Sequence, residues 1–123
     1  MTISPKDETA ALAWMDGIEV AATVCDCQGI CLYMNERAAQ VFAKDGGRAL
    51  IGKNLLDCHP QSARAHFAAQ LATPAPNSYT IEKAGIRKLI HQIPWYRDGV
   101  FSGVVELSLV LPETLPHFVR DAG

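Results

Sequence analysis

The 123-residue sequence lacks both a strong charge of one sign and a long apolar run. Its formal net charge is −2 and its basic residues are scattered, which argues against direct binding of nucleic acid. No apolar run approaches the ~18 residues of a membrane span, and the polar, acidic start MTISPKDETA is unlike a secretory signal. We therefore expect a cytoplasmic protein that binds neither membranes nor nucleic acid.

Common catalytic motifs are also missing. The sequence has no phosphate-binding P-loop, no dinucleotide-binding glycine pattern and no H-E-x-x-H helix. Cys58 beside His59 lacks the context of known cysteine nucleophiles, because neighbours in sequence rarely point at each other. The acidic residues Glu82, Asp98 and Glu106 are interpreted as solvent-facing charges in strands or turns. The sequence predicts a protein that is not an enzyme.

The cysteines do not have the spacing of a zinc site. Cys25, Cys27 and Cys31 lack the C-x2-C pattern, and Cys58 stands alone. A reducing compartment would keep all of them as thiols. Two interpretations remain open: packing as small core residues, which we favour, and a soft-metal or redox cluster across a hairpin.

What the sequence does contain is a regular order of short apolar segments. Hydrophobic residues make up 49% of the chain, enough for one core. Helix formers end at Gly17, and the next two segments alternate apolar and polar residues around a glycine turn. The expected elements are a helix at 8–16, strands at 18–26 and 29–35, a helix from 36 capped by Asn35, helical turns at 48–51, a helix at 61–72, and strands at 78–85, 86–97 and 100–111.

The last two of these strands meet at Asp98-Gly99, a dipeptide that favours hairpin turns. Pro94 within the strand before it indicates an edge position or a bulge, because proline cannot donate to the strand ladder. Strands at both ends with helices between them predict an α+β fold, a five-stranded antiparallel sheet with short helices on one face and an N-terminal helix. We divide the chain into a flanking helix at 1–17, a domain at 18–111 and a tail at 112–123.

Over residues 9–111 the chain resembles the PAS family of sensory domains. The opening IEVAATVCDCQGICLYMNERAAQVF is similar to the PAS strand, glycine turn, strand and asparagine-capped helix. GRALIGKNLLD is similar to the family's I-G-K/R stretch before its long helix, and CHP at 58–60 to a subgroup of small bacterial members. The end, IRKLIHQIPWYRDGVFSGVVELSLVL, is similar to the last two PAS strands. The resemblance implies the PAS fold and a ligand pocket between the sheet and the helices.

The resemblance leaves the cofactor open, because PAS domains hold haem, flavin, other chromophores, metabolites or nothing. A covalent flavin photoadduct is disfavoured, since Leu55 follows Gly52-Lys53-Asn54 where flavin photosensors have a cysteine. The spacing disfavours a chromophore attached to Cys58. Haem is the leading specific candidate, because oxygen-sensing members take an axial histidine from the long central helix, where His66 lies. A surface position for His66 is the competing interpretation, and we expect a metal only if haem is present.

The expected pocket residues come from both the strands and the helices. His91 and Ile93 share a face in the strand at 86–97 and would line the pocket if that strand is regular. The competing interpretation, equally open, is that His91 is a hydrogen-bonded residue of the sheet. His59 is expected to fix the loop before the next helix or to line the pocket. The candidate pocket residues are Tyr33, Asn35, Phe42, Leu55, Cys58, His59, His66, Phe67, His91 and Ile93.

The resemblance also implies how such a module would signal. We expect a sensory module that binds a small ligand or cofactor, forms a homodimer, and acts through a separate signalling protein, with transcription regulation among the outputs. The helix at 8–16 would pack across the sheet of its own chain or of its partner, covering Leu107 and Leu109. The alternative interpretation is an interaction module with no ligand, ahead of a haem-based gas or redox sensor and of an enzyme.

Overall fold

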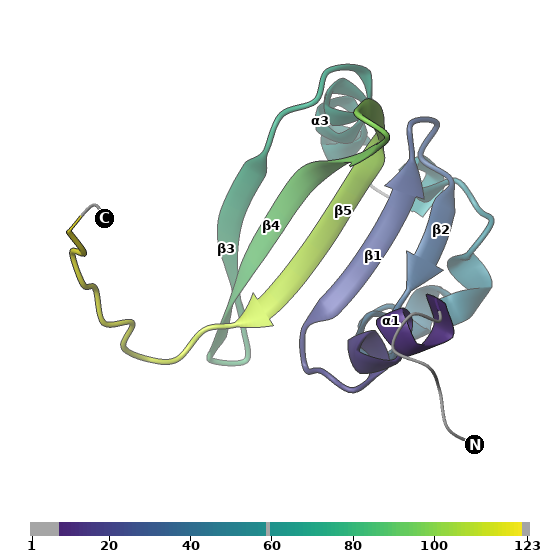
Figure 1. The fold of residues 1–123 in the computed structure, drawn as a ribbon. Helices are drawn as coiled ribbons and strands as arrows, with labels where there is room; N and C mark the ends of the chain where they lie inside the picture. Colours follow the sequence, from purple (N-terminus) through teal and green to yellow (C-terminus); the bar gives the residue numbers. More distant parts are fainter. Residues whose placement is uncertain (1–7, 59, 122–123) are drawn as a thin grey trace.

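The computed structural model describes residues 8–58 and 60–121 (Figure 1). The elements are α1 (Glu8–Asp16), β1 (Ala21–Asp26), β2 (Cys31–Met34), α2 (Glu36–Val41), the 3-10 helices η1 (Ala43–Asp45), η2 (Gly47–Leu50) and η3 (Leu55–Cys58), α3 (Gln61–Ala72), β3 (Asn77–Lys83), β4 (Ile86–Arg97) and β5 (Val100–Val110). The strands form one five-stranded sheet in the order β2-β1-β5-β4-β3, and every pair is antiparallel. The predicted α+β class is confirmed.

Most predicted segments are found with small changes at their ends. The helices at 8–16 and 61–72 and the strand at 86–97 have the predicted bounds. The first strand begins at Ala21, not at residue 18, because its pairing with β5 starts only at the Ala21–Ser108 pair. Local alternation cannot reveal where a partner strand ends, so this boundary was wrong by three residues.

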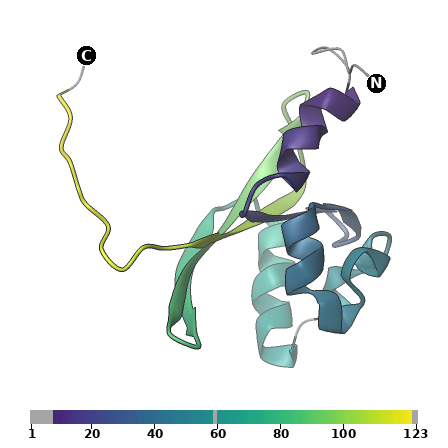
Figure 2. The ribbon, with the colours of Figure 1, turned by 90° about the horizontal axis from the view of Figure 1, so that it is seen from below.

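The helices α2 and α3 cover one face of the sheet, which we call the inner face (Figure 2). Cys25 and Val104 of this face pack against Phe67 and Leu71 of α3. A second buried cluster lies at the β2 side of the sheet and contains Ala21, Cys31, Met34, Ala38 and Leu50. The described structure therefore has its core on the inner face, between the sheet and the helical segment.

Asn35 joins α1, β1 and α2. Its side chain is fully buried, and Oδ1 accepts hydrogen bonds from the backbone N–H groups of Ala38 and Ala22, both at 3.0 Å. Its Nδ2 donates to the carbonyl oxygens of Met15 at 2.8 Å and Val20 at 2.7 Å. The bond to Ala38 is the predicted N-cap of α2. The other three bonds were not visible in the sequence, because their partners lie 13 to 20 residues away.

Helix α1 does not lie over Leu107 and Leu109 of its own sheet. It stands beside the start of β1, on the opposite side of the sheet from α2 and α3 (Figures 1 and 2). Its last residue, Asp16, holds it there: Oδ1 accepts from the Glu36 N–H at 2.9 Å and from Arg48 Nη2 at 3.1 Å. The version of the prediction in which α1 covers its own sheet is therefore wrong, while the version with a partner's sheet stays a prediction.

The strand β4 changes its pairing at Pro94. β3 pairs with β4 only as far as Gln92, so Pro94 lies where β4 is locally an edge. The register with β5 then shifts between Trp95 and Tyr96. Both outcomes agree with the prediction of an edge or a bulge, since proline has no N–H to donate.

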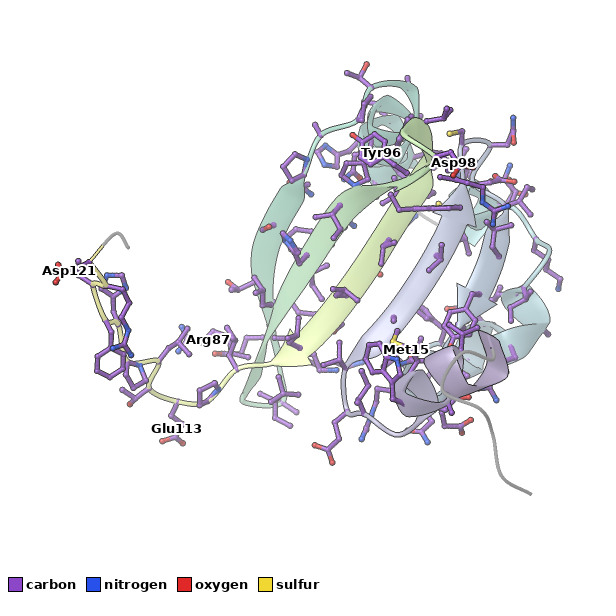
Figure 3. All side chains as sticks on the ribbon, in the orientation of Figure 1. Met15, Arg87, Tyr96, Asp98, Glu113 and Asp121 are labelled. Atoms are coloured by element: carbon purple, nitrogen blue, oxygen red, sulfur yellow. The ribbon has the colours of Figure 1, made fainter. Side chains whose placement is uncertain are left out.

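Beyond β5 the chain runs away from the sheet as an extended tail, on which Glu113 and Asp121 lie (Figure 3). The Leu111 N–H still donates to the Arg87 carbonyl oxygen at 2.9 Å, and no helix or strand follows up to Asp121. Among the described residues, no helix has the length and apolar character to cross a membrane.

Candidate functional site

A cavity of about 350 Å³ lies between the inner face of the sheet and the helical segment. Its walls are Ala21, Thr23, Cys25, Met34, Val41, Phe42, Asp45, Leu50, Leu55, Phe67, Tyr79, Ile81, Lys88, Ile90, Gln92, Val104, Glu106 and Ser108. Val41, Tyr79 and Ile81 are each more than 40% exposed, so the cavity opens to solvent between α2 and β3. Its size is within the range of pockets that bind small molecules.

The two sides of this cavity differ in chemistry. The helical side is lined mainly by apolar side chains, among them Phe42, Leu55 and Phe67, and Asp45 adds one carboxylate. The sheet side carries a hydrogen-bonded row that crosses three strands: Asn77 Nδ2 donates to Gln92 Oε1 at 2.9 Å, and Gln92 Nε2 donates to Glu106 Oε1 at 2.8 Å. The strand register places these three side chains side by side, because Asn77 pairs with Gln92 and Gln92 pairs with Glu106. A bound molecule would meet a mainly apolar helical wall and, on the sheet side, a polar row set among apolar residues such as Ile90 and Val104.

The negative charge of Glu106 affects a second residue of the cavity wall, Tyr79. The pKa of the Tyr79 phenol is raised, first by burial and then by the negative charge of Glu106. Tyr79 therefore keeps its proton at neutral pH and can donate a hydrogen bond to a ligand. Glu106 itself is half-buried and not solvent-facing, so our interpretation of this residue as a surface charge was wrong. The sequence feature that could have indicated this position is the single charged residue within the apolar run VVELSLV.

Of the candidate pocket residues, the structure brings Phe42, Leu55 and Phe67 together in the cavity wall. Asn35 lies outside the wall and uses its side chain to join the three elements described above. Tyr33 is also outside the wall, with the carboxylate of Asp16 close enough to raise its pKa after the larger effect of burial. These two residues belong to the junction of α1 and α2.

His91 and Ile93 lie on the outer face of the sheet. Ile90 and Gln92 line the cavity, and alternate residues of a strand point to opposite faces. His91 Nδ1 instead hydrogen-bonds Ser78 Oγ at 2.6 Å. The expectation that His91 faces the cavity was wrong because both faces of β4 carry apolar residues, and periodicity alone does not say which face is inner.

The described donors around the cavity do not fit a haem. His66 is exposed on α3, since its neighbour Phe67 takes the buried position, and His117 lies on the exposed tail. His59 and the side chain of Cys58 are outside the described residues. Cys25 lines the cavity, but burial raises its pKa from 9.0 to about 11, so its sulfur is a neutral thiol at neutral pH. Thus no imidazole or thiolate among the described side chains faces the cavity.

The described cysteines lie in or near the core. Cys25 and Cys31 are buried and pair across the β1–β2 hairpin. Cys27 Sγ donates to the Phe101 carbonyl oxygen at 3.5 Å. Within residues 8–58 and 60–121, no group of three or more His, Cys, Asp or Glu side chains is placed to hold a metal ion.

The PAS-fold family sequence model matches residues 15–106 of this chain. Comparison with curated protein sequences gives no significant match. Many solved structures share the fold. One is the Aer2 receptor of Vibrio cholerae, a dual PAS-haem oxygen sensor, with a TM-score of 0.62 and 20% identity over 80% of this chain and 99% of that one.

Two further structures show the same likeness. The PAS domain of BvgS from Bordetella pertussis has a TM-score of 0.62 and 16% identity, covering 87% of this chain and 89% of that chain. VqmA bound to DPO has a TM-score of 0.63 and 12% identity, covering 85% of this chain and 57% of that chain. At these identities the structures show a common fold, whereas the family match extends over most of the sequence. The chain belongs to the PAS family.

Proposed function

We propose that this PAS domain is a sensory module that binds a small ligand in the cavity and reports its occupancy through dimer or partner contacts. The observation that carries the proposal is a cavity of about 350 Å³ with a mainly apolar helical wall and the hydrogen-bonded row of Gln92 and Glu106 opposite. A few polar groups in an apolar pocket are how proteins orient small molecules. PAS domains are typically sensory and not catalytic, and the fold is shared with an oxygen sensor and with VqmA bound to DPO.

Strand β5 offers a direct route from the cavity to the opposite face of the sheet. Glu106 and Ser108 line the cavity, while Leu107 between them faces the other side. A ligand that shifts β5 would therefore displace residues on both faces. Such coupling between two sites is typically worth about 1–3 kcal/mol.

Filling the cavity is expected to remove the ligand. In Ser108→Phe a large side chain would enter the cavity from β5, so a small molecule that co-purifies with the wild-type protein should be lost. Native mass spectrometry measures this directly. Thr80→Phe is the matched control, because Thr80 is an exposed strand residue outside the cavity wall. Retention of the molecule by Ser108→Phe would contradict binding in this cavity.

A pure interaction module is the second candidate, favoured by the outer face of the sheet. This face carries the apolar residues Val24, Leu89, Ile93, Val105, Leu107 and Leu109. No helix of the described chain lies across β4 and β5 on this side (Figure 1). These side chains are half-buried within the chain, and an apolar patch that stays partly open to solvent usually marks an interaction site. The proposed homodimer would use this face, with or without a ligand in the cavity.

We expect Leu107→Asp to weaken self-association by at least about tenfold, because a carboxylate would be buried without a partner at the centre of the interface. Sedimentation velocity over a range of protein concentrations measures the change. Leu115→Asp introduces the same charge on the exposed tail and should leave the dimer intact. A wild-type protein that is monomeric at all concentrations, or a fully dimeric Leu107→Asp variant, would refute this role of the outer face.

A further inference from the structure

We propose that the ligand of this cavity is a small, largely apolar molecule that carries one protonated amine, held by the carboxylate of Glu106. This inference rests on the proposed function and adds the chemical class of the ligand. It depends on three features of the cavity: an unpaired carboxylate, an excess of negative charge in the walls, and an apolar surface opposite.

Glu106 lies on β5, the central strand of the sheet, and none of the described side chains forms an ion pair with it. It is half-buried, and its Oε1 accepts a hydrogen bond from the neutral amide of Gln92 at 2.8 Å. Arg37 and Arg48 bind other carboxylates, those of Glu19, Asp16 and Glu36, at the α1–α2 side of the domain. Carboxylates removed from water are usually paired with a cation. The Glu106 carboxylate faces the cavity and can therefore still bind one.

The other charges of the wall do not neutralise Glu106. Lys88 lies four residues before Gln92 on β4, about 13 Å along the strand from the partner of Glu106. No ion pair joins Lys88 to Glu106 in the described structure. Asp45 adds a second carboxylate from the helical side. The walls therefore contain two carboxylates and one ammonium group, which favours a ligand with a positive charge.

The wall opposite Glu106 suits the apolar part of such a molecule. Phe42 and Phe67 line the helical side, together with Leu55. Aromatic faces attract cations as well as apolar groups, so they do not oppose the entry of an amine. An ammonium group at Glu106 and a ring against the phenylalanines would satisfy both walls with one small molecule.

Three probes of similar size and different charge test this inference: 2-phenylethylamine, 2-phenylethanol and phenylacetate. Isothermal titration calorimetry at neutral pH should give the tightest binding for the amine. In Glu106→Gln, which keeps the size and the hydrogen-bonding oxygen, binding of the amine should weaken about 10–100-fold, the usual effect of losing a charge-assisted hydrogen bond. Binding of the alcohol should change by less than about threefold, since a neutral hydrogen bond is worth little net free energy.

Glu113→Gln is the matched control, because it removes the same charge from the tail, away from the sheet (Figure 3). It should bind the amine like the wild type. Thermal melting of each variant checks that the fold is kept. An amine that binds no tighter than the alcohol, or equally well to Glu106→Gln, would overturn the inference.

The binding experiments distinguish a failure of this inference from a failure of the proposed function. If the alcohol or the acid binds and the amine does not, and if Ser108→Phe abolishes that binding, the cavity is a ligand site for another chemical class. The inference about Glu106 is then wrong and the proposed function stands. If none of the probes binds and no small molecule co-purifies with the wild-type protein, both are wrong.

Discussion

Replacing Asn35 by aspartate is expected to lower the free energy of unfolding by about 3–5 kcal/mol. The side chain is fully buried, and its Nδ2 donates to the carbonyl oxygens of Met15 and Val20. Aspartate puts a carboxylate oxygen in place of this donor, so it faces two acceptors at hydrogen-bonding distance. The bonds that Oδ1 accepts from Ala22 and Ala38 remain, and they cannot compensate for a buried charge without a cation.

Urea unfolding followed by circular dichroism measures this loss. Asn54→Asp is the control with the same chemical change: Asn54 is only half-buried, keeps the bond that Oδ1 accepts from the Leu56 N–H, and loses one long bond of 3.3 Å to the Gln28 carbonyl oxygen. We expect it to cost about 1 kcal/mol or less. Equal losses in the two variants would show that the bonds of Asn35 to α1 and β1 do not stabilise the fold.

Replacing Gly103 by alanine is expected to cost at least about 3 kcal/mol or to prevent folding. Gly103 has φ +146°, a backbone conformation that L residues rarely adopt, and an added Cβ would overlap the Cys25 carbonyl oxygen and the Cα of Asp26. The neighbouring strand cannot yield easily, because the same Cys25 carbonyl accepts a hydrogen bond from Trp95 Nε1 at 2.9 Å. The close approach of β5 to β1 therefore requires glycine at this position.

Gly99→Ala separates the clash from the effect of backbone conformation. Gly99 also has a positive φ, +79°, but no atom lies within 4 Å of its added Cβ. We expect this variant to cost about 1–2 kcal/mol, the usual cost of a left-handed conformation for a residue with a Cβ. Thermal unfolding of both variants gives the comparison. If Gly103→Ala is as stable as Gly99→Ala, the packing of β5 against β1 tolerates a methyl group and our interpretation of the contact is wrong.

The order of elements could be predicted from the sequence because its signals are local. Alternating apolar residues indicated the strands, Asn35 indicated the start of α2, and Asp98-Gly99 indicated the turn between β4 and β5. Each signal depends on backbone preferences within a few residues, which act in the same way in any fold. The match to the PAS family over residues 15–106 agrees with this order.

The candidate site was predicted only in its apolar part. Phe42 and Phe67 were expected in the wall because helices bury their apolar stripe against a sheet, and Leu55 because the PAS resemblance implies a pocket beside this stretch. The polar part was missed, since Gln92 and Glu106 are far apart in sequence and meet only through the pairing of β4 with β5. His91 was placed on the wrong face, and His66 was found exposed.

The elements of this PAS domain, their turns and the cap of α2 follow from the local sequence, because neighbouring residues decide these features. Long-range packing sets which face of β4 is inner, where α1 rests, and that Glu106 faces a cavity. Those features depend on strand register and on contacts between distant segments. A period of two defines two faces of a strand, and only the packing of helices on one of them makes that face the inner one.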